Sequence, residues 1–125
     1  MAVAVWDRPD RNRLLGELTA AVRGALPDGP DPYRLADPAE MQALLGACGA
    51  TDTAARSLVL VHEAAGVDEL WDGLLGGTAR ISTVLAGLPA ATRARVRAAF
   101  AERVAPAGGA VALEAAVTIG SATFA

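Results

Sequence analysis

The only histidine of the chain, His62, stands beside Glu63 at the end of the apolar run Leu58 to Val61. An imidazole changes its protonation near neutral pH, which suits it to general acid–base catalysis. Such catalysis also needs a second group held in place, and the spacing of residues around His62 supplies none. The catalytic residues are therefore unknown, with His62 as the one candidate.

A second set of candidates combines aromatic and acidic side chains. Trp6 and Asp7 follow the apolar run Met1 to Val5, and ligands of open α/β sheets bind outside the carboxyl ends of the strands. These two residues are candidates for substrate binding, and the alternative is a core or interface role for Trp6 and a turn or capping role for Asp7. Trp71 is a third candidate for substrate binding, because it would lie above the same edge and line a substrate pocket, or else it packs in the core. A small hydrophobic molecule is a possible partner.

A lone cysteine, Cys48, excludes an internal disulfide and any multi-cysteine metal site. No metal is therefore expected, and a reducing cytoplasm suits the chain. Cys48 could act as a nucleophile only with a base nearby and an exposed thiolate. Its place on the apolar face of a predicted helix instead indicates a buried and inert side chain.

The charged residues give no sign of a polyanionic partner. Arg93, Arg95 and Arg97 could suggest an anion site, but a spacing of two scatters them around a helix, so a solvated face is the better interpretation. The net charge is -3 and no basic stripe is present, so we expect neither nucleic acid nor a membrane as a partner. No stretch approaches the roughly 18 apolar residues of a membrane span, and the first residues lack the pattern of a signal peptide. We expect a soluble cytoplasmic protein.

The stretch from Asp31 to Glu63 predicts a loop, a capped helix, a tight turn and a buried strand, Leu58 to Val61. Asp37 is the expected N-cap and Pro38 the first helical residue, because Pro lacks the N–H that a first turn leaves unpaired. Gly49 supplies the permissive residue that ends the helix. The side chains expected on its buried face are Met41, Leu44, Leu45 and Cys48.

The rest of the chain predicts two more strands and three more helices in one domain of 125 residues, 53% of them hydrophobic. Met1 to Val5 is a continuous apolar run, which is typical of a strand buried on both faces. In the last strand, Ala110 to Ile119, the apolar side chains alternate along one face. The helices are expected from about Asn12 to Leu26, from an N-cap at Asp68 past a bend at Gly76-Gly77, and from Thr92 to Val104.

The segments AVWDRP, PYRLADPAEMQALLGACGA, SLVLVHE and VDELWDGLLGG together resemble the C-terminal half of class I S-adenosylmethionine-dependent methyltransferases of the small-molecule type. The resemblance covers nearly the whole chain. It implies that Met1 to Val5, Leu58 to Val61 and Ala110 to Ile119 correspond to the fifth, sixth and seventh strands of that family. The implied fold is a three-stranded mixed α/β sheet in the order 1-3-2, with the last strand central and antiparallel. About four helices would flank this half of a Rossmann-like fold.

The cofactor-binding signatures of that family are missing from this sequence. The family uses a glycine-rich loop after the first strand, an acidic residue after the second and an aspartate beside the adenine. Gly76-Gly77 and Gly108-Gly109 are isolated pairs without the strand-to-helix setting of such a loop. The family implies S-adenosylmethionine, but we expect this chain alone to bind no cofactor and Met1 to fall in the middle of a larger fold.

Three hypotheses for the function follow. The first is a methyltransferase-like fragment without methyl-transfer activity of its own, which contributes a substrate pocket or an assembly surface. The second is one half of a split methyltransferase, and the third is a non-catalytic module for small-molecule binding or dimerisation. The strand Met1 to Val5 would have an unpaired edge, so we predict a homodimer or a partner chain bound through it.

Overall fold

The computed structural model describes residues 1–25, 31 and 33–125. The predicted end of the first helix, at Leu26, lies outside these residues. Within the described part the chain is an α/β structure with three strands and five α-helices. None of the described helices is both long and apolar enough to cross a membrane.

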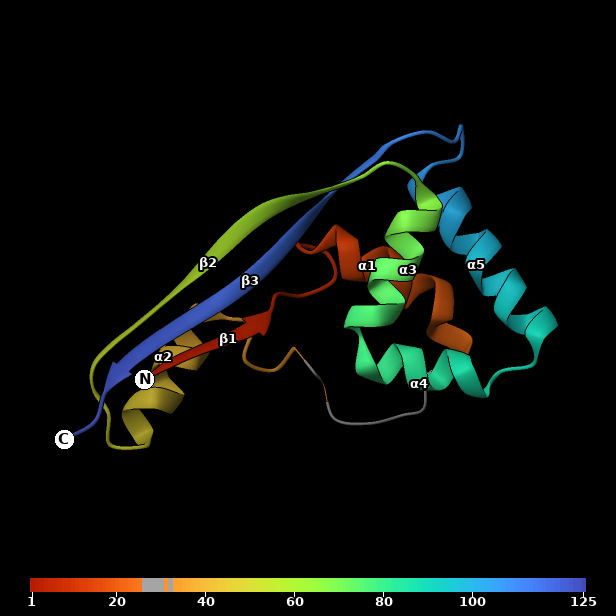
Figure 1. Cartoon of the computed structure of the whole chain (residues 1–125). Helices are drawn as coiled ribbons and strands as arrows, with labels where there is room; N and C mark the ends of the chain where they lie inside the picture. Colours follow the sequence, from red (N-terminus) through yellow and green to blue (C-terminus); the bar gives the residue numbers. More distant parts are fainter. Residues whose placement is uncertain (26–30, 32) are drawn as a thin grey trace.

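The three strands form one sheet in which the last strand is central. β1 (Ala2–Trp6), β2 (Thr51–Ala64) and β3 (Val111–Thr123) lie in the order β1-β3-β2, and both neighbouring pairs are antiparallel. The predicted strand order is confirmed. The prediction of a mixed sheet is wrong, because β3 separates the two strands that run in the same direction (Figure 1).

β2 is much longer than the predicted strand Leu58 to Val61. Its first half contains small and polar residues without the alternation that predicts a strand, and pairing with β3 from Ala54 to Ala64 holds it extended. The prediction of a buried strand is also wrong, because Val59, Leu60 and Val61 are all exposed. β2 lies at the edge of the sheet, where cross-strand pairing is available on one side only.

Side chains cap the first two α-helices, and the cap of the second is the predicted Asp37. The Asn12 side chain accepts a hydrogen bond from the backbone of Leu15 and caps α1 (Arg13–Val22), which continues as the 3-10 helix η1 (Arg23–Ala25). Asp37 caps α2 (Pro38–Ala47) by accepting bonds from two backbone N–H groups of the first turn. Gly49 has φ = 82°, the left-handed conformation that ends a helix at little cost for glycine.

The segment between β2 and β3 forms three helices rather than the two expected, so the structure has five α-helices instead of about four. These are α3 (Val67–Gly77), α4 (Ala79–Gly87) and α5 (Ala90–Val104). The predicted bend is a full break at Thr78, whose hydroxyl donates to the Leu74 carbonyl. The predicted N-cap at Asp68 is also wrong, because the helix already begins at Val67, after Gly66.

The helices cover opposite faces of the sheet at its two ends (Figure 1). At one end, the side chains of Val111, Leu113 and Ala115 are buried in a core shared with α1, α3, α4 and α5. From Ala116 onward the buried residues of β3 change to the other face, where α2 packs. Each face of the sheet is therefore covered by helices over only part of its length.

Candidate functional site

Trp6 and Asp7 project from opposite faces of the sheet. The side chain of Trp6 is 47% exposed, whereas Asp7 is 1% exposed. Successive residues of an extended chain alternate between faces, which explains the difference. The prediction of burial on both faces for Met1 to Val5 is wrong for the same reason, because α2 covers only the face that holds Val3 and Val5.

Asp7 belongs to a buried polar cluster at the end of β1. Its Oδ1 accepts a 2.7 Å hydrogen bond from the Arg8 backbone, and its Oδ2 lies 3.3 Å from Nη1 of Arg11 and 3.5 Å from the donating hydroxyl of Ser57. The Thr118 hydroxyl lies 3.4 Å from that of Ser57 and donates to the carbonyl of Ala36. These contacts join the end of β1 to β2, to β3 and to the loop before α2.

Trp71 lies in the core of the helical end of the molecule. Its ring packs against that of Phe100 with 5.6 Å between centroids and an interplanar angle of 47°. Both side chains are buried. Trp71 is thus a core residue, whereas Trp6 is 47% exposed and Asp7 lies in the polar cluster at the end of β1.

His62 and Glu63 lie on β2 with both side chains exposed. Because they are consecutive strand residues, the imidazole and the carboxylate project to opposite faces of the sheet. Within the described part of the chain no cluster of three or more His, Cys, Asp or Glu side chains could hold a metal ion. The arrangement brings no acid–base pair together around His62.

Cys48 is exposed, so the prediction of a buried thiol is wrong. It is the C-cap of α2, and this helix buries only Met41 and Leu45 against the sheet. The predicted apolar face of α2 is therefore narrower than expected, and Leu44 also lies partly in solvent.

The arginines of α5 do not converge on a common point. Arg93 is exposed, Arg95 lies 3.3 Å from the Thr92 hydroxyl on its own helix, and Arg97 forms an ion pair with Asp68 of α3. These contacts agree with the interpretation of the three side chains as a solvated face.

Part of one sheet face, which we call the Trp6 face, has none of the described helices over it. Residues directly opposite each other in neighbouring strands share a face, and the register puts Val117 between Trp6 and Leu58, and Ile119 beside Ala4. Trp6 is 47% exposed, and Leu60 is 62% exposed. The apolar residues of the Trp6 face are Ala4, Trp6, Leu58, Leu60, Val117 and Ile119, and the same register places the exposed Arg56 on this face opposite Ile119.

The outer edge of β2 carries a second exposed apolar group, which sequence analysis missed. Val59, Leu60 and Val61 are 56%, 62% and 62% exposed. Among the described residues no strand pairs with this edge or with the outer edge of β1. One signal was present in the sequence: three consecutive apolar residues in a strand point to both faces, so they are all buried only if both faces are covered.

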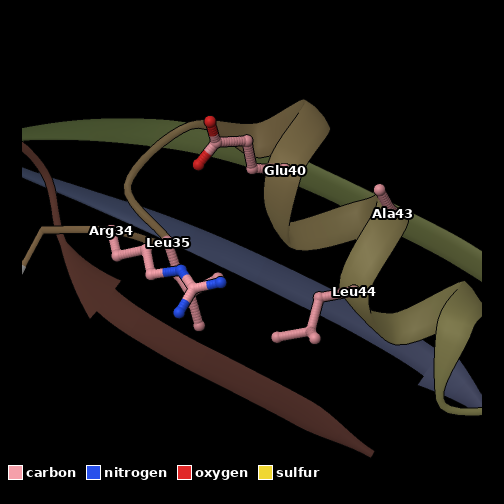
Figure 2. A pocket seen from close by; sticks show the side chains of 5 residues that line it. All are labelled: Arg34, Leu35, Glu40, Ala43 and Leu44. Carbon is pink, nitrogen blue, oxygen red and sulfur yellow. The ribbon is translucent and has the colours of Figure 1, made fainter.

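A shallow groove of about 430 Å³ lies between α2 and the loop that precedes it. Figure 2 shows the Leu44 side chain from α2 and those of Arg34 and Leu35 from the loop approaching one another near β1. Glu40 and Ala43 complete the lining. The groove combines an apolar floor with one cation and one carboxylate at its rim.

No protein-family model matches the chain, and no curated protein is similar to it.

Proposed function

We propose that this chain is the C-terminal half of a fold like that of class I small-molecule methyltransferases. In this proposal it neither holds S-adenosylmethionine nor transfers a methyl group by itself. It acts by joining an α/β half that carries the cofactor. The observation that carries the proposal is the uncovered Trp6 face, which exposes a tryptophan and a leucine on a sheet whose opposite face is covered by α2.

The strand order supports this proposal. The family resemblance implies that the seventh strand lies between the fifth and sixth strands and runs in the opposite direction to both. β3 lies in the same way between β1 and β2. In α/β folds of this class helices cover both faces of the sheet. A sheet whose two faces are each covered over only part of their length is therefore expected of a half that packs against further elements.

The outer edge of β1 is the proposed seam with the second half. Met1 and Ala122 exchange two backbone hydrogen bonds, of 2.7 and 2.9 Å. Bonded pairs alternate along an antiparallel ladder, so the N–H and C=O groups of Ala2, Ala4 and Trp6 point away from β3. A strand of the partner half, corresponding to the fourth strand of the family, would pair with these groups. A second copy of the chain could pair with the same edge of β1 instead.

Methyl transfer requires the donor to be held in line with the nucleophile. The residues that hold the donor in the family have no counterpart in this sequence, so the partner must supply them. Trp6 lies next to the proposed seam, where its exposed side chain would contribute to substrate binding in the assembled protein. Asp7 would act by holding the end of β1 in place through its buried polar contacts. A reducing compartment such as the cytoplasm suits the exposed thiol of Cys48.

Isothermal titration of the isolated chain with S-adenosylmethionine tests the first part of the proposal. We expect no binding at micromolar concentrations, and a micromolar Kd for the chain alone would refute the need for a second half.

Purification of the tagged chain from its native host tests the second part. The expected partner is an α/β chain with a glycine-rich loop after its first strand, and the purified pair should bind S-adenosylmethionine. Ala4→Pro removes an outward N–H from β1 and should abolish the pair, because an edge strand tolerates proline but then cannot donate to a neighbour. The matched variant Val61→Lys, at the other edge of the sheet, should keep the pair. Recovery of the chain only as a monomer or homodimer would contradict the proposal.

A second candidate function is a non-catalytic module that binds a small hydrophobic molecule, and the groove beside α2 favours it. Its volume falls within the range of small-ligand sites, roughly 300–1,000 Å³. Leu44→Lys should then abolish binding of an apolar fluorescent dye, whereas Leu60→Lys should not. The reverse result would place dye binding on the Trp6 face and reject the groove.

A further inference from the structure

We infer that two copies of this chain pair along the outer edges of β2, across a two-fold axis at Leu60, to form one six-stranded antiparallel sheet. This surface lies on the opposite edge of the sheet from the seam in the proposed function. The inference does not depend on that function, because a partner at β1 leaves the outer edge of β2 open.

The hydrogen-bond pattern of the sheet fixes which groups of β2 face outward. The backbone N–H of Asp7 donates to the Ala116 carbonyl at 2.8 Å, and the backbone N–H of Ala122 donates to the Met1 carbonyl at 2.9 Å. The even-numbered residues of β3 therefore form their backbone hydrogen bonds with β1. The odd-numbered residues of β3 therefore bond to β2, where their partners in the register are even-numbered. The residues of β2 that present N–H and C=O groups outward are thus Ser57, Val59, Val61 and Glu63.

This edge has few of the features that usually prevent strands from pairing with other chains. Such features are a short strand, charged side chains (above all lysine) or proline on the edge, a bulge, or a covering element. The only charged residue of the outward-facing set is Glu63, at its end. β2 has 14 residues, and its single register shift lies between Thr51 and Ala54, away from the apolar centre. Residues 57–63 read SLVLVHE, with no lysine or proline. The sequence thus leaves seven residues free to pair.

The side chains of this segment select one register for two identical antiparallel strands. With the axis at Leu60, the two copies of Leu60 face each other, Val59 faces Val61 of the second copy, and Ser57 faces Glu63. This arrangement places apolar side chains at the centre and polar ones at both ends, as in specific interfaces. An axis at Val61 would set Glu63 against Val59 and remove the carboxylate from water without a partner, which is costly. An axis at Val59 would set Val61 against Ser57 and lose the matching of apolar side chains.

The area available is enough for a reversible dimer. The three apolar side chains are each more than half exposed, and together they offer on the order of 300 Å² per copy. The backbone and the polar side chains of the same segment add a similar area. The dimer would then bury on the order of 1,000 Å² in total, the lower end for specific interfaces. We therefore expect association at micromolar concentrations.

Sedimentation velocity over a range of about 1–200 µM tests the assembly. We expect the mass to rise reversibly from that of one chain to that of two. Val61→Lys places an ammonium group at the centre of the pairing segment and should keep the chain monomeric over this range. The matched control is Leu44→Lys, which makes the same kind of change at an exposed apolar residue of α2 and should leave the dimer intact.

Disulfide cross-linking tests the register and does not depend on a destabilising variant. In a Cys48→Ala background, Leu60→Cys places two thiols opposite each other at the axis, where Cα atoms of an antiparallel non-bonded pair lie about 4.5 Å apart. Mild oxidation should give a covalent dimer. Val59→Cys is the matched control, because its two copies would be diagonal neighbours about 7–8 Å apart and should cross-link at least tenfold more slowly.

Four outcomes would overturn the inference. These are a monomer at all concentrations, a dimer that survives Val61→Lys, equal cross-linking at positions 59 and 60, and oligomers that keep growing beyond two chains. Circular dichroism of each variant confirms that it is folded before its mass is interpreted.

Discussion

Replacement of Phe100 by alanine is the sharpest test of the helical core, because Phe100 has no exposed surface and its ring contacts Trp71. Removing a buried phenyl group from a packed core lowers the free energy of unfolding by about 3–5 kcal/mol. A chain of this length is expected to have only about 6–19 kcal/mol in total. Phe100→Ala should therefore remove a large share of the stability.

Urea unfolding followed by tryptophan fluorescence measures this loss. A Trp6→Phe background leaves Trp71 as the only reporter, and its buried ring should emit at longer wavelength when the core opens. With an m-value of about 2 kcal/mol/M, the midpoint should fall by roughly 2 M. Phe124→Ala is the matched control, because the only other phenylalanine is 43% exposed and its loss should cost less than about 0.5 kcal/mol.

The reasoning would be refuted if Phe100→Ala cost less than about 1 kcal/mol, or no more than Phe124→Ala. Either result would mean that Trp71 and Phe100 do not form the packed core between α3 and α5. In that case Trp71 would again be a candidate for lining a substrate pocket, as well as for packing in the core.

Three further variants test the packing of α2 and its loop by the same urea assay. Gly120→Ala should lower the free energy of unfolding by about 1–3 kcal/mol, because its Cβ would lie 2.9 Å from Cγ of Met41 in a filled core, and full stability would contradict that contact. Gly46→Ala should instead raise it by about 0.4–1 kcal/mol, since this helical position opens onto free space, and a loss would show unexpected crowding. Thr118→Val should cost about 1–3 kcal/mol, because the buried carbonyl of Ala36 loses its hydroxyl donor, and an unchanged midpoint would argue against that bond.

Local sequence signals predicted the ends of α2 well. Asp37 followed by Pro38 defines a helix start by chemistry that involves only neighbouring residues, and Gly49 provides a left-handed helix end in the same way. The predicted order of the strands, derived from family resemblance, is also confirmed.

Signals that depend on distant partners were less reliable. The apolar run at Leu58 to Val61 predicted a strand, but nothing in the run itself says whether helices will cover both of its faces. Cys48 occupied an apolar position on the predicted helix, yet the contact of α2 with the sheet is too narrow to include it. Burial depends on the elements that pack against a residue, and these come from remote parts of the chain.

The sequence by itself determined the secondary-structure type of most segments, the caps of α2, and the alternation of side chains along β3, because these depend on neighbouring residues. Only the tertiary structure decided which face of the sheet each helix covers. The change of the buried face between Ala115 and Ala116 requires two groups of helices to pack on opposite sides. That change leaves Trp6 exposed and Asp7 buried, although the two residues are adjacent in the chain.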